Sequence, residues 1–109
     1  MSSRMIREGI LSSERIDKLT ESGEIFYRRL LSVVDDFGRY HAKPALLRAH
    51  LYPLRLDRMP ESTIASLLAE CAAAGLIQVY EDEGKAVLQV HKFDQQIRIK
   101  RSKFPAPPV

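Results

Sequence analysis

Residues 60–77 decide the fold, and they read PESTIASLLAECAAAGLI. Apolar side chains recur in this stretch at i, i+3, i+4 and i+7, which is the spacing of one helix face. They are Ile64, Leu67, Leu68 and Cys71. Pro60 suits the first helical position, which places the N-cap on Met59, and Gly75 supplies the left-handed residue that ends many helices. The stretch therefore predicts a helix from Pro60 that stops at Gly75.

Two short segments with a period of two follow this helix directly. They are residues 76–80 and 85–93, separated by the polar, glycine-containing turn 81–85. Such alternation on both sides of a turn predicts an antiparallel β-hairpin. A helix that ends in Gly-Leu-Ile and runs straight into a hairpin is typical of a winged helix-turn-helix.

Three further helices are expected before Pro60. Ser12 or Ser13 caps a brief one. Ser22 begins the clearest helix, which carries an apolar stripe and ends at Gly38. The stripe consists of Phe26, Leu30, Val33, Val34 and Phe37. The third helix spans residues 45–51, with Pro44 at its first position and Pro53 beyond its end.

This order predicts a mainly α protein with a small β-hairpin (α+β), arranged as a winged helix-turn-helix. The helix after Lys43 and the helix from Pro60 form the helix-turn-helix pair. We expect one shared core of Phe26, Leu30, Val34, Leu47, Ile64, Leu67, Leu68 and Ile77. A chain of 109 residues suits one domain, which we place at residues 1–94.

Residues 95–109 form a basic, proline-rich tail. Four basic and no acidic side chains lie there, so removing them from the 17 basic residues leaves 13 against 14 acidic ones. Three of the six prolines follow Phe104 and favour an extended conformation. We expect a weakly ordered arm in which Ile97 and Ile99 would be the anchors, or the start of a linker to a missing C-terminal region.

The composition gives little support to several classes of function. No signal peptide or membrane span is visible, so we expect a cytoplasmic protein without membrane contact. Cys71 lies on an apolar helix face and is expected to be a buried thiol without a nucleophilic role. The histidines lack metal-ligand spacing, and the glycines form no phosphate loop. We therefore expect a protein that is not an enzyme, with no catalytic residue, no metal and no cofactor.

Several short motifs lie along the chain in an order that is shared with one known group of proteins. They are residues 4–9, the helix running into residues 35–39, Leu51-Tyr52-Pro53, residues 74–77, residues 90–93 and the basic residues 103–105. Together they resemble the N-terminal winged-helix domain of phage replication proteins, the replisome-organiser or DnaD-like group. The resemblance implies DNA replication, phage or prophage origin, and helicase-loading or other replisome partners. Members of that group bind origin DNA with this domain or mainly self-associate through it.

The exposed face of the helix from Pro60 carries small side chains. Ser62, Ser66, Ala69 and Ala73 lie there, with Glu70 alongside. Reading base edges ordinarily takes arginine, lysine, asparagine or glutamine, so Ser62 and Ser66 would discriminate bases weakly. The turn of the hairpin holds three carboxylates (residues 81–83) against Lys85, which opposes contact with phosphates.

Cations that suit phosphate contacts are more numerous. They are Arg39, Lys43, Arg48, Arg55, Arg58, Lys85, Arg98, Lys100, Arg101 and Lys103, with His50 beside them. The alternative for Arg48, Arg55 and Arg58 is that they solvate a surface and pair with Asp57 or Glu61. Any binding through these cations should weaken steeply with salt, because phosphate contacts release counterions.

Two functions of different kinds follow. The first is a DNA-binding module of a phage-type replication initiation protein, which contacts mostly phosphates with low sequence specificity. The second is a self-association module that forms a homo-oligomer through the Ser62-Ala69-Ala73 face or through exposed Tyr40 and Tyr52. A transcriptional regulator with the same fold is a third, lesser alternative.

Overall fold

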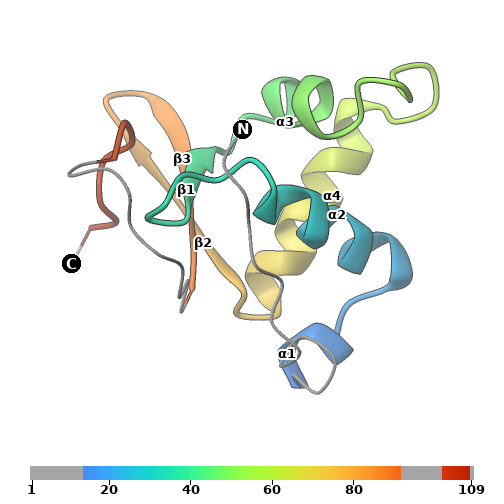
Figure 1. Ribbon diagram of the computed structural model, residues 1–109, viewed down its shortest axis with the longest axis horizontal. Coiled ribbons are helices and arrows are strands. Elements are labelled where there is room, and N and C mark those ends of the chain that lie inside the picture. Colours follow the sequence, from blue (N-terminus) through green and yellow to red (C-terminus); the bar gives the residue numbers. More distant parts are fainter. Residues whose placement is uncertain (1–13, 92–101, 109) are drawn as a thin grey trace.

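The computed structural model describes residues 14–91 and 102–108, with helices and strands in separate layers (Figure 1). The helices are α1 (Glu14–Asp17), α2 (Glu21–Leu31), α3 (Pro44–Leu51) and α4 (Glu61–Ala73). The strands are β1 (Arg39–His41), β2 (Ile77–Asp82) and β3 (Lys85–Val90). The described part of the chain is thus an α+β domain, as the sequence predicts at that level.

The sheet has one strand more than the expected hairpin. Its order is β1-β3-β2, and both pairings are antiparallel. The additional strand, β1, is only three residues long, too short for a period of two to reveal it. Its pairing with β3 places Tyr40 opposite Leu88 and His41 opposite Val87.

The predicted pairing of the two alternating segments is confirmed over β2 and β3. The turn between them is shorter than the five residues expected, because Glu83 and Gly84 alone connect the strands. Their φ angles are 51° and 78°, as in a two-residue turn with both central residues left-handed. Such a turn matches the right-handed twist of the strands and makes a tight hairpin tip. Residues 92 and 93 of the expected strand lie outside the described residues.

Helix α2 begins and ends earlier than the sequence predicts. Its first residue is Glu21 rather than Ser22, and its N-cap is Thr20, whose hydroxyl accepts from the Gly23 N–H at 3.0 Å. The helix ends at Leu31 rather than at Gly38. Asp35 Oδ1 accepts the backbone N–H groups of residues 37 and 39 at 2.9 and 3.0 Å, and such local bonds compete with helix formation.

The start of α4 also differs by one residue. Pro60 occupies the N-cap position expected for Met59, and Glu61 is the first helical residue. Pro60 has an extended backbone conformation and makes no side-chain capping bond.

The core lies between the helices and one face of the sheet. All eight predicted core residues are buried, which confirms that prediction. Cys71 is buried among them, and burial raises the pKa of its thiol to about 12, with a smaller contribution from Glu70. Tyr52 is buried too, at 2% exposure, so the expectation of an exposed tyrosine there is wrong. Arg29 explains part of this burial, because its guanidinium lies 4.5 Å from the centre of the Tyr52 ring.

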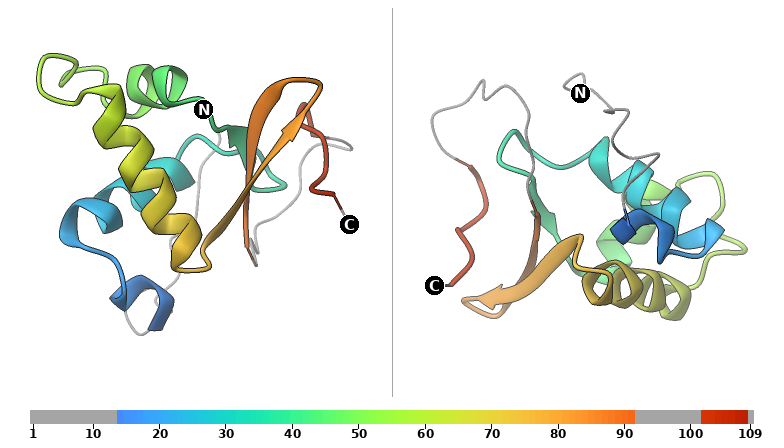
Figure 2. Two further views of the ribbon diagram at one scale, coloured as in Figure 1. Left: turned by 180° about the vertical axis from the view of Figure 1, so that it is seen from behind. Right: turned by 90° about the horizontal axis from the view of Figure 1, so that it is seen from below.

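Residues 102–108 form a third layer on the side of the sheet away from the helices, as both views of Figure 2 show. Phe104 lies against His41, with ring centroids 4.9 Å apart. Tyr80 and Val87, which alternate onto this outer face, are buried, although neither belongs to the core beneath the helices. The described end of the expected free arm is therefore packed on the domain. The expected anchors, residues 97 and 99, lie outside the described residues.

Candidate nucleic-acid interface

Three exposed lysines are each connected to His41, through the chain, through charge or through a contact of a neighbouring residue. Lys43 follows His41 by two residues, and Lys85 is close enough to affect the pKa of that histidine. Lys103 directly precedes Phe104, whose ring contacts His41. Figures 1 and 2 show the 102–108 segment beside the sheet, on the side away from the helices. Lys43, Lys85 and Lys103 are called the lysine cluster below.

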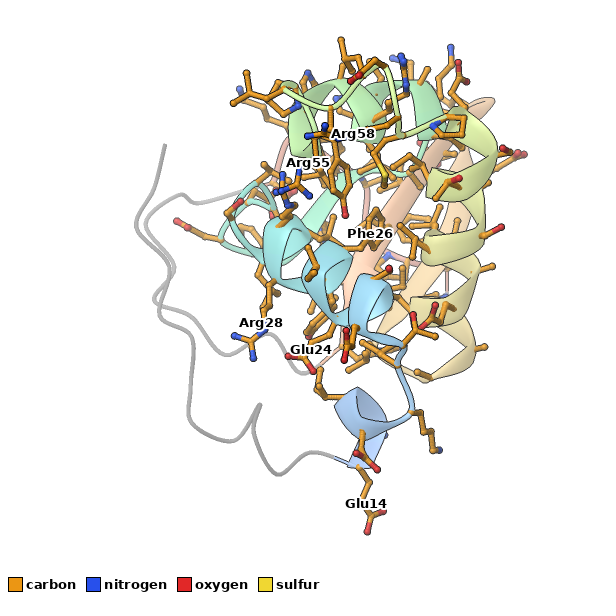
Figure 3. All side chains as sticks on the ribbon, turned by 90° about the vertical axis from the view of Figure 1, so that its right-hand side faces the viewer. Glu14, Glu24, Phe26, Arg28, Arg55 and Arg58 are labelled. Atoms are coloured by element: carbon orange, nitrogen blue, oxygen red, sulfur yellow. The ribbon has the colours of Figure 1, made fainter. Side chains whose placement is uncertain are left out.

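Local structure leaves these lysines available to a ligand. Lys43 is the N-cap residue of α3, but its side chain makes no capping bond, and Pro44 follows at the first helical position. Lys85 begins β3 opposite Asp82. Within residues 14–91 and 102–108 the only ion pair joins Glu24 and Arg28, on the surface of α2 (Figure 3).

The surroundings of His41 disfavour the protonated form of its imidazole. Burial lowers the pKa of its imidazole, and the charges of His50 and Lys85 lower it further. His50 in turn shares a hydrogen bond between its Nδ1 and the Tyr40 hydroxyl, at 2.6 Å. The neutral form of His41 is thus favoured, which suits its packing against the Phe104 ring.

The hairpin tip opposes a polyanion. Glu81, Asp82 and Glu83 are all exposed there, as the sequence predicts. Asp82 stands opposite Lys85 in the β2–β3 register and offsets part of its charge. A phosphate backbone would therefore meet the lysine cluster from beside the tip rather than across it.

The exposed face of α4 carries the expected small side chains. Ser62, Ser66, Ala69 and Ala73 are all exposed. Glu70 departs from the expectation, because its carboxylate turns to Thr20 and accepts the backbone N–H at 2.6 Å. The face therefore offers serine hydroxyls as its polar groups, and these bond any base edge with little discrimination.

Two of the arginines that were predicted to contact phosphates form hydrogen bonds within the protein instead. Arg39 donates from Nε to Gln89 at 2.8 Å and from Nη1 to the Phe104 carbonyl at 3.2 Å. Arg48 donates from Nε to the Met59 carbonyl at 2.7 Å and from Nη2 to the Leu56 carbonyl. Their guanidinium groups hold the tail segment and the α3–α4 loop, so we leave both out of the candidate interface.

Arg55 and Arg58 are exposed, but they lie in the loop between α3 and α4, across the molecule from the hairpin tip (Figures 1 and 3). The alternative that they pair with Asp57 or Glu61 is not observed, because no such ion pair occurs within the described residues. The structure therefore does not bring them together with the lysine cluster. Arg98, Lys100 and Arg101 lie outside the described residues.

The contacts that hold the tail segment were not predicted from the sequence. His41, Tyr80 and Phe104 come from a three-residue strand, a hairpin and a proline-rich segment, and only the tertiary fold brings them together. The pairing of an aromatic residue with prolines in residues 104–108 was the one signal that could have suggested docking on an aromatic surface.

Within the described parts of the chain, no group of three or more histidine, cysteine, aspartate or glutamate side chains is arranged to hold a metal ion. The helices of residues 14–91 also lack the length and apolar character that a membrane crossing requires. Comparisons with protein-family models, curated proteins and solved structures find no match to this chain.

Proposed function

We propose that the chain is a winged helix-turn-helix module that binds DNA mostly through phosphates. The fold name is supported by the order of elements: α3 and α4 form a helix pair, and α4 leads directly into the β2–β3 hairpin. The loop between the two helices is longer than in the tightest helix-turn-helix motifs. We therefore identify the helix pair by the packing of α3 against α4 and not by the length of the turn.

Two observations carry the proposal: the exposed lysine cluster, and an exposed α4 face that has no base-reading side chain. Lysines that meet phosphates supply affinity and position, whereas base-edge contacts supply sequence discrimination. Lys43, Lys85 and Lys103 are exposed and free of ion pairs within the described residues. Binding should therefore be sensitive to salt and nearly indifferent to sequence, with a dissociation constant of about 10⁻⁴–10⁻⁶ M at physiological salt.

The biological setting that we propose is initiation of phage-type DNA replication. It rests on the resemblance of the short motifs in the sequence to replisome-organiser or DnaD-like domains. Replisome proteins such as a helicase loader are the protein partners that this setting implies.

The experiment is a salt titration of binding between the full chain and duplexes of two unrelated sequences. Alanine at Arg98, Lys100, Arg101 and Lys103 together should weaken binding to both duplexes alike and flatten the dependence of affinity on salt. Ser66→Ala is the matched control and should change neither quantity. Binding that depends on Ser62 or Ser66 for one sequence, and is unchanged in the quadruple variant, would contradict the proposal.

Self-association is the second candidate, and exposed apolar side chains in the α3–α4 loop favour it. Leu54 is 90% exposed and Leu56 is 42% exposed. Arg48 holds this loop in place through two carbonyl groups, so the loop presents Leu54 to the solvent in an ordered conformation. Light scattering of the parent and of Leu54→Asp tests this candidate. Self-association is supported if the parent has a mass above that of the monomer and Leu54→Asp has a lower mass.

A further inference from the structure

The segment 102–108 is held on the outer face of the sheet by side chains from separate parts of the fold. Arg39 Nη1 and the Tyr80 hydroxyl donate to the carbonyl groups of Phe104 and Pro105, respectively. The Ser102 hydroxyl donates to Asp35 Oδ2 and also accepts from the Phe104 N–H at 3.0 Å. Burial raises the pKa of the Tyr80 phenol, which keeps it protonated as a donor.

Phe104 is the side chain that fits this segment to the domain. Its ring lies 4.9 Å from the His41 ring at 90° and 5.8 Å from the Tyr40 ring, counted between centroids. Edge-to-face and tilted contacts at these distances add to the stabilisation from buried apolar area. The polar contacts of Arg39 and Tyr80 reach backbone carbonyls, which a change of the Phe104 side chain leaves in place. Replacing Phe104 therefore removes the aromatic contacts alone, which should loosen the segment while every cation stays in the chain.

The docked segment fixes where Lys103 stands. Lys103 is exposed and adjacent to Phe104, whereas Lys43 is the N-cap residue of α3 and Lys85 is the first residue of β3. A lysine on an unattached segment would have to be ordered at the moment of binding, and that entropy cost would reduce its contribution. For the docked Lys103, this entropy is already lost before DNA binds.

We propose that Phe104 is a positioning residue for nucleic-acid binding: the contact of its ring with His41 holds Lys103 beside Lys43 and Lys85 and completes the lysine cluster. This inference rests on the proposed DNA binding. It adds that the proline-rich segment acts as part of the binding surface and not as a flexible arm. It also predicts linkage, because DNA that contacts Lys103 should stabilise the docked segment.

The test compares the full chain with Lys103→Ala, Phe104→Ala and the double variant on a labelled mixed-sequence duplex. The measured quantity is the slope of log binding constant against log salt concentration. Lys103→Ala should reduce its magnitude by about 0.9, the value for one phosphate contact. Phe104→Ala should reduce it at least as much, although it removes no charge, and the double variant should lose less than the sum. Lys18→Ala, which removes an exposed lysine directly after α1, at the other end of the molecule, is the control and should leave the slope unchanged.

Trypsin cleavage after Lys103 reports docking independently of DNA. Cleavage should be faster in Phe104→Ala than in the parent, and added duplex should slow it in the parent alone. Tyr80→Phe, which removes only the hydroxyl that reaches Pro105, should shift both readouts in the same direction by a smaller amount. Phe104→Tyr should keep both readouts close to those of the parent, because it keeps an aromatic ring against His41.

The outcomes separate this inference from the proposed function. If Phe104→Ala releases the segment but keeps the slope of the parent, or if the two single effects add fully, the inference is wrong and DNA binding stands. If the parent shows no salt-dependent binding to any duplex, both are wrong.

Discussion

The carboxylate of Glu70 on α4 binds Thr20, the residue that caps α2. Glu70 Oε2 accepts the Thr20 backbone N–H at 2.6 Å, and the two carboxylate oxygens accept from its hydroxyl at 3.0 and 3.1 Å. The same hydroxyl accepts from the Gly23 N–H within α2. One acidic side chain thus joins the start of α2 to the last turn of α4, fifty residues further along the chain.

Removing that carboxylate should destabilise the domain. Glu70→Ala should lower the free energy of unfolding by about 1.5–3 kcal/mol, the range for hydrogen bonds to a charged group. Urea denaturation measures the change. Glu61→Ala, which removes an exposed carboxylate from the first turn of the same helix, is the control and should stay within about 0.5 kcal/mol of the parent. Equal effects of the two variants would show that the contact with Thr20 has no special weight.

Gly23 should resist substitution for a reason that the Glu70 contact supplies. Alanine normally stabilises a helix interior by about 1 kcal/mol over glycine. Here a β-carbon at Gly23 would lie 2.7 Å from Glu70 Cδ, so the carboxylate would have to leave Thr20. Gly23→Ala should therefore lower the denaturation midpoint in the parent but raise it in a Glu70→Ala background. A lower midpoint in both backgrounds would contradict this explanation.

The core predicts a sharp contrast between two leucines. Leu68 is 8% exposed and packs in the core, whereas Leu54 is 90% exposed in the α3–α4 loop. Leu68→Ala should cost about 2–5 kcal/mol, the range for a buried leucine. Leu54→Ala should change stability by less than about 0.5 kcal/mol. Thermal and urea denaturation of both variants measure the difference, and a comparable loss at Leu54 would argue against the loop conformation.

These core positions could be predicted from the sequence because their periodicity is local. Helical spacing marked Phe26, Leu30, Ile64 and Leu68, and alternation marked the hairpin, so apolar patterning alone located the buried face of each long element. Boundaries were predicted less accurately. The helix expected to begin at Ser22 begins one residue earlier, at Glu21, after Thr20 as its N-cap. The contact of Thr20 with Glu70, fifty residues away, is one that no local pattern reports.

The remaining features depend on contacts that no local pattern reports. Strand β1 is stabilised by its pairing with β3 and is too short to show alternation. Arg39 and Arg48 looked like surface cations, but backbone carbonyls brought close by the tertiary fold occupy them. Composition described residues 104–108 as a proline-rich arm, while the aromatic contact with His41 decides where that segment lies.

Arg48 has a structural role, and variants at Arg48 and Lys43 should distinguish that role from a role in DNA binding. Arg48→Lys keeps the charge but cannot reproduce the planar fork that reaches the carbonyl groups of Leu56 and Met59. We expect it to lower the free energy of unfolding by about 1–3 kcal/mol and to keep the salt dependence of DNA binding. Lys43→Ala should do the opposite, flattening the salt dependence while stability stays within about 0.5 kcal/mol. Denaturation and binding measured on both variants test the assignment, and an unchanged stability in Arg48→Lys would contradict it.

The lowered pKa of His41 predicts a loss of stability on mild acidification. Below its ordinary pKa of 6.5, the unfolded chain takes up a proton on this imidazole before the folded chain does. The free energy of unfolding should therefore fall as the pH drops from 6.5 through the folded pKa, and this histidine should have no influence above that window. His41→Asn removes the titration, so its stability should decline less than that of the parent over the same interval.

The cause of the shift can be tested in the same experiment. Burial is the largest contribution to the lowered pKa of His41, ahead of the charges of His50 and Lys85. Because Phe104 packs on the ring, Phe104→Ala should raise the pKa of His41 toward 6.5, and Lys85→Ala should raise it by less. Titration of the imidazole by NMR measures the pKa, and denaturation at a series of pH values measures the stability. Parallel pH profiles for the parent and His41→Asn would show that this histidine does not link protonation to folding.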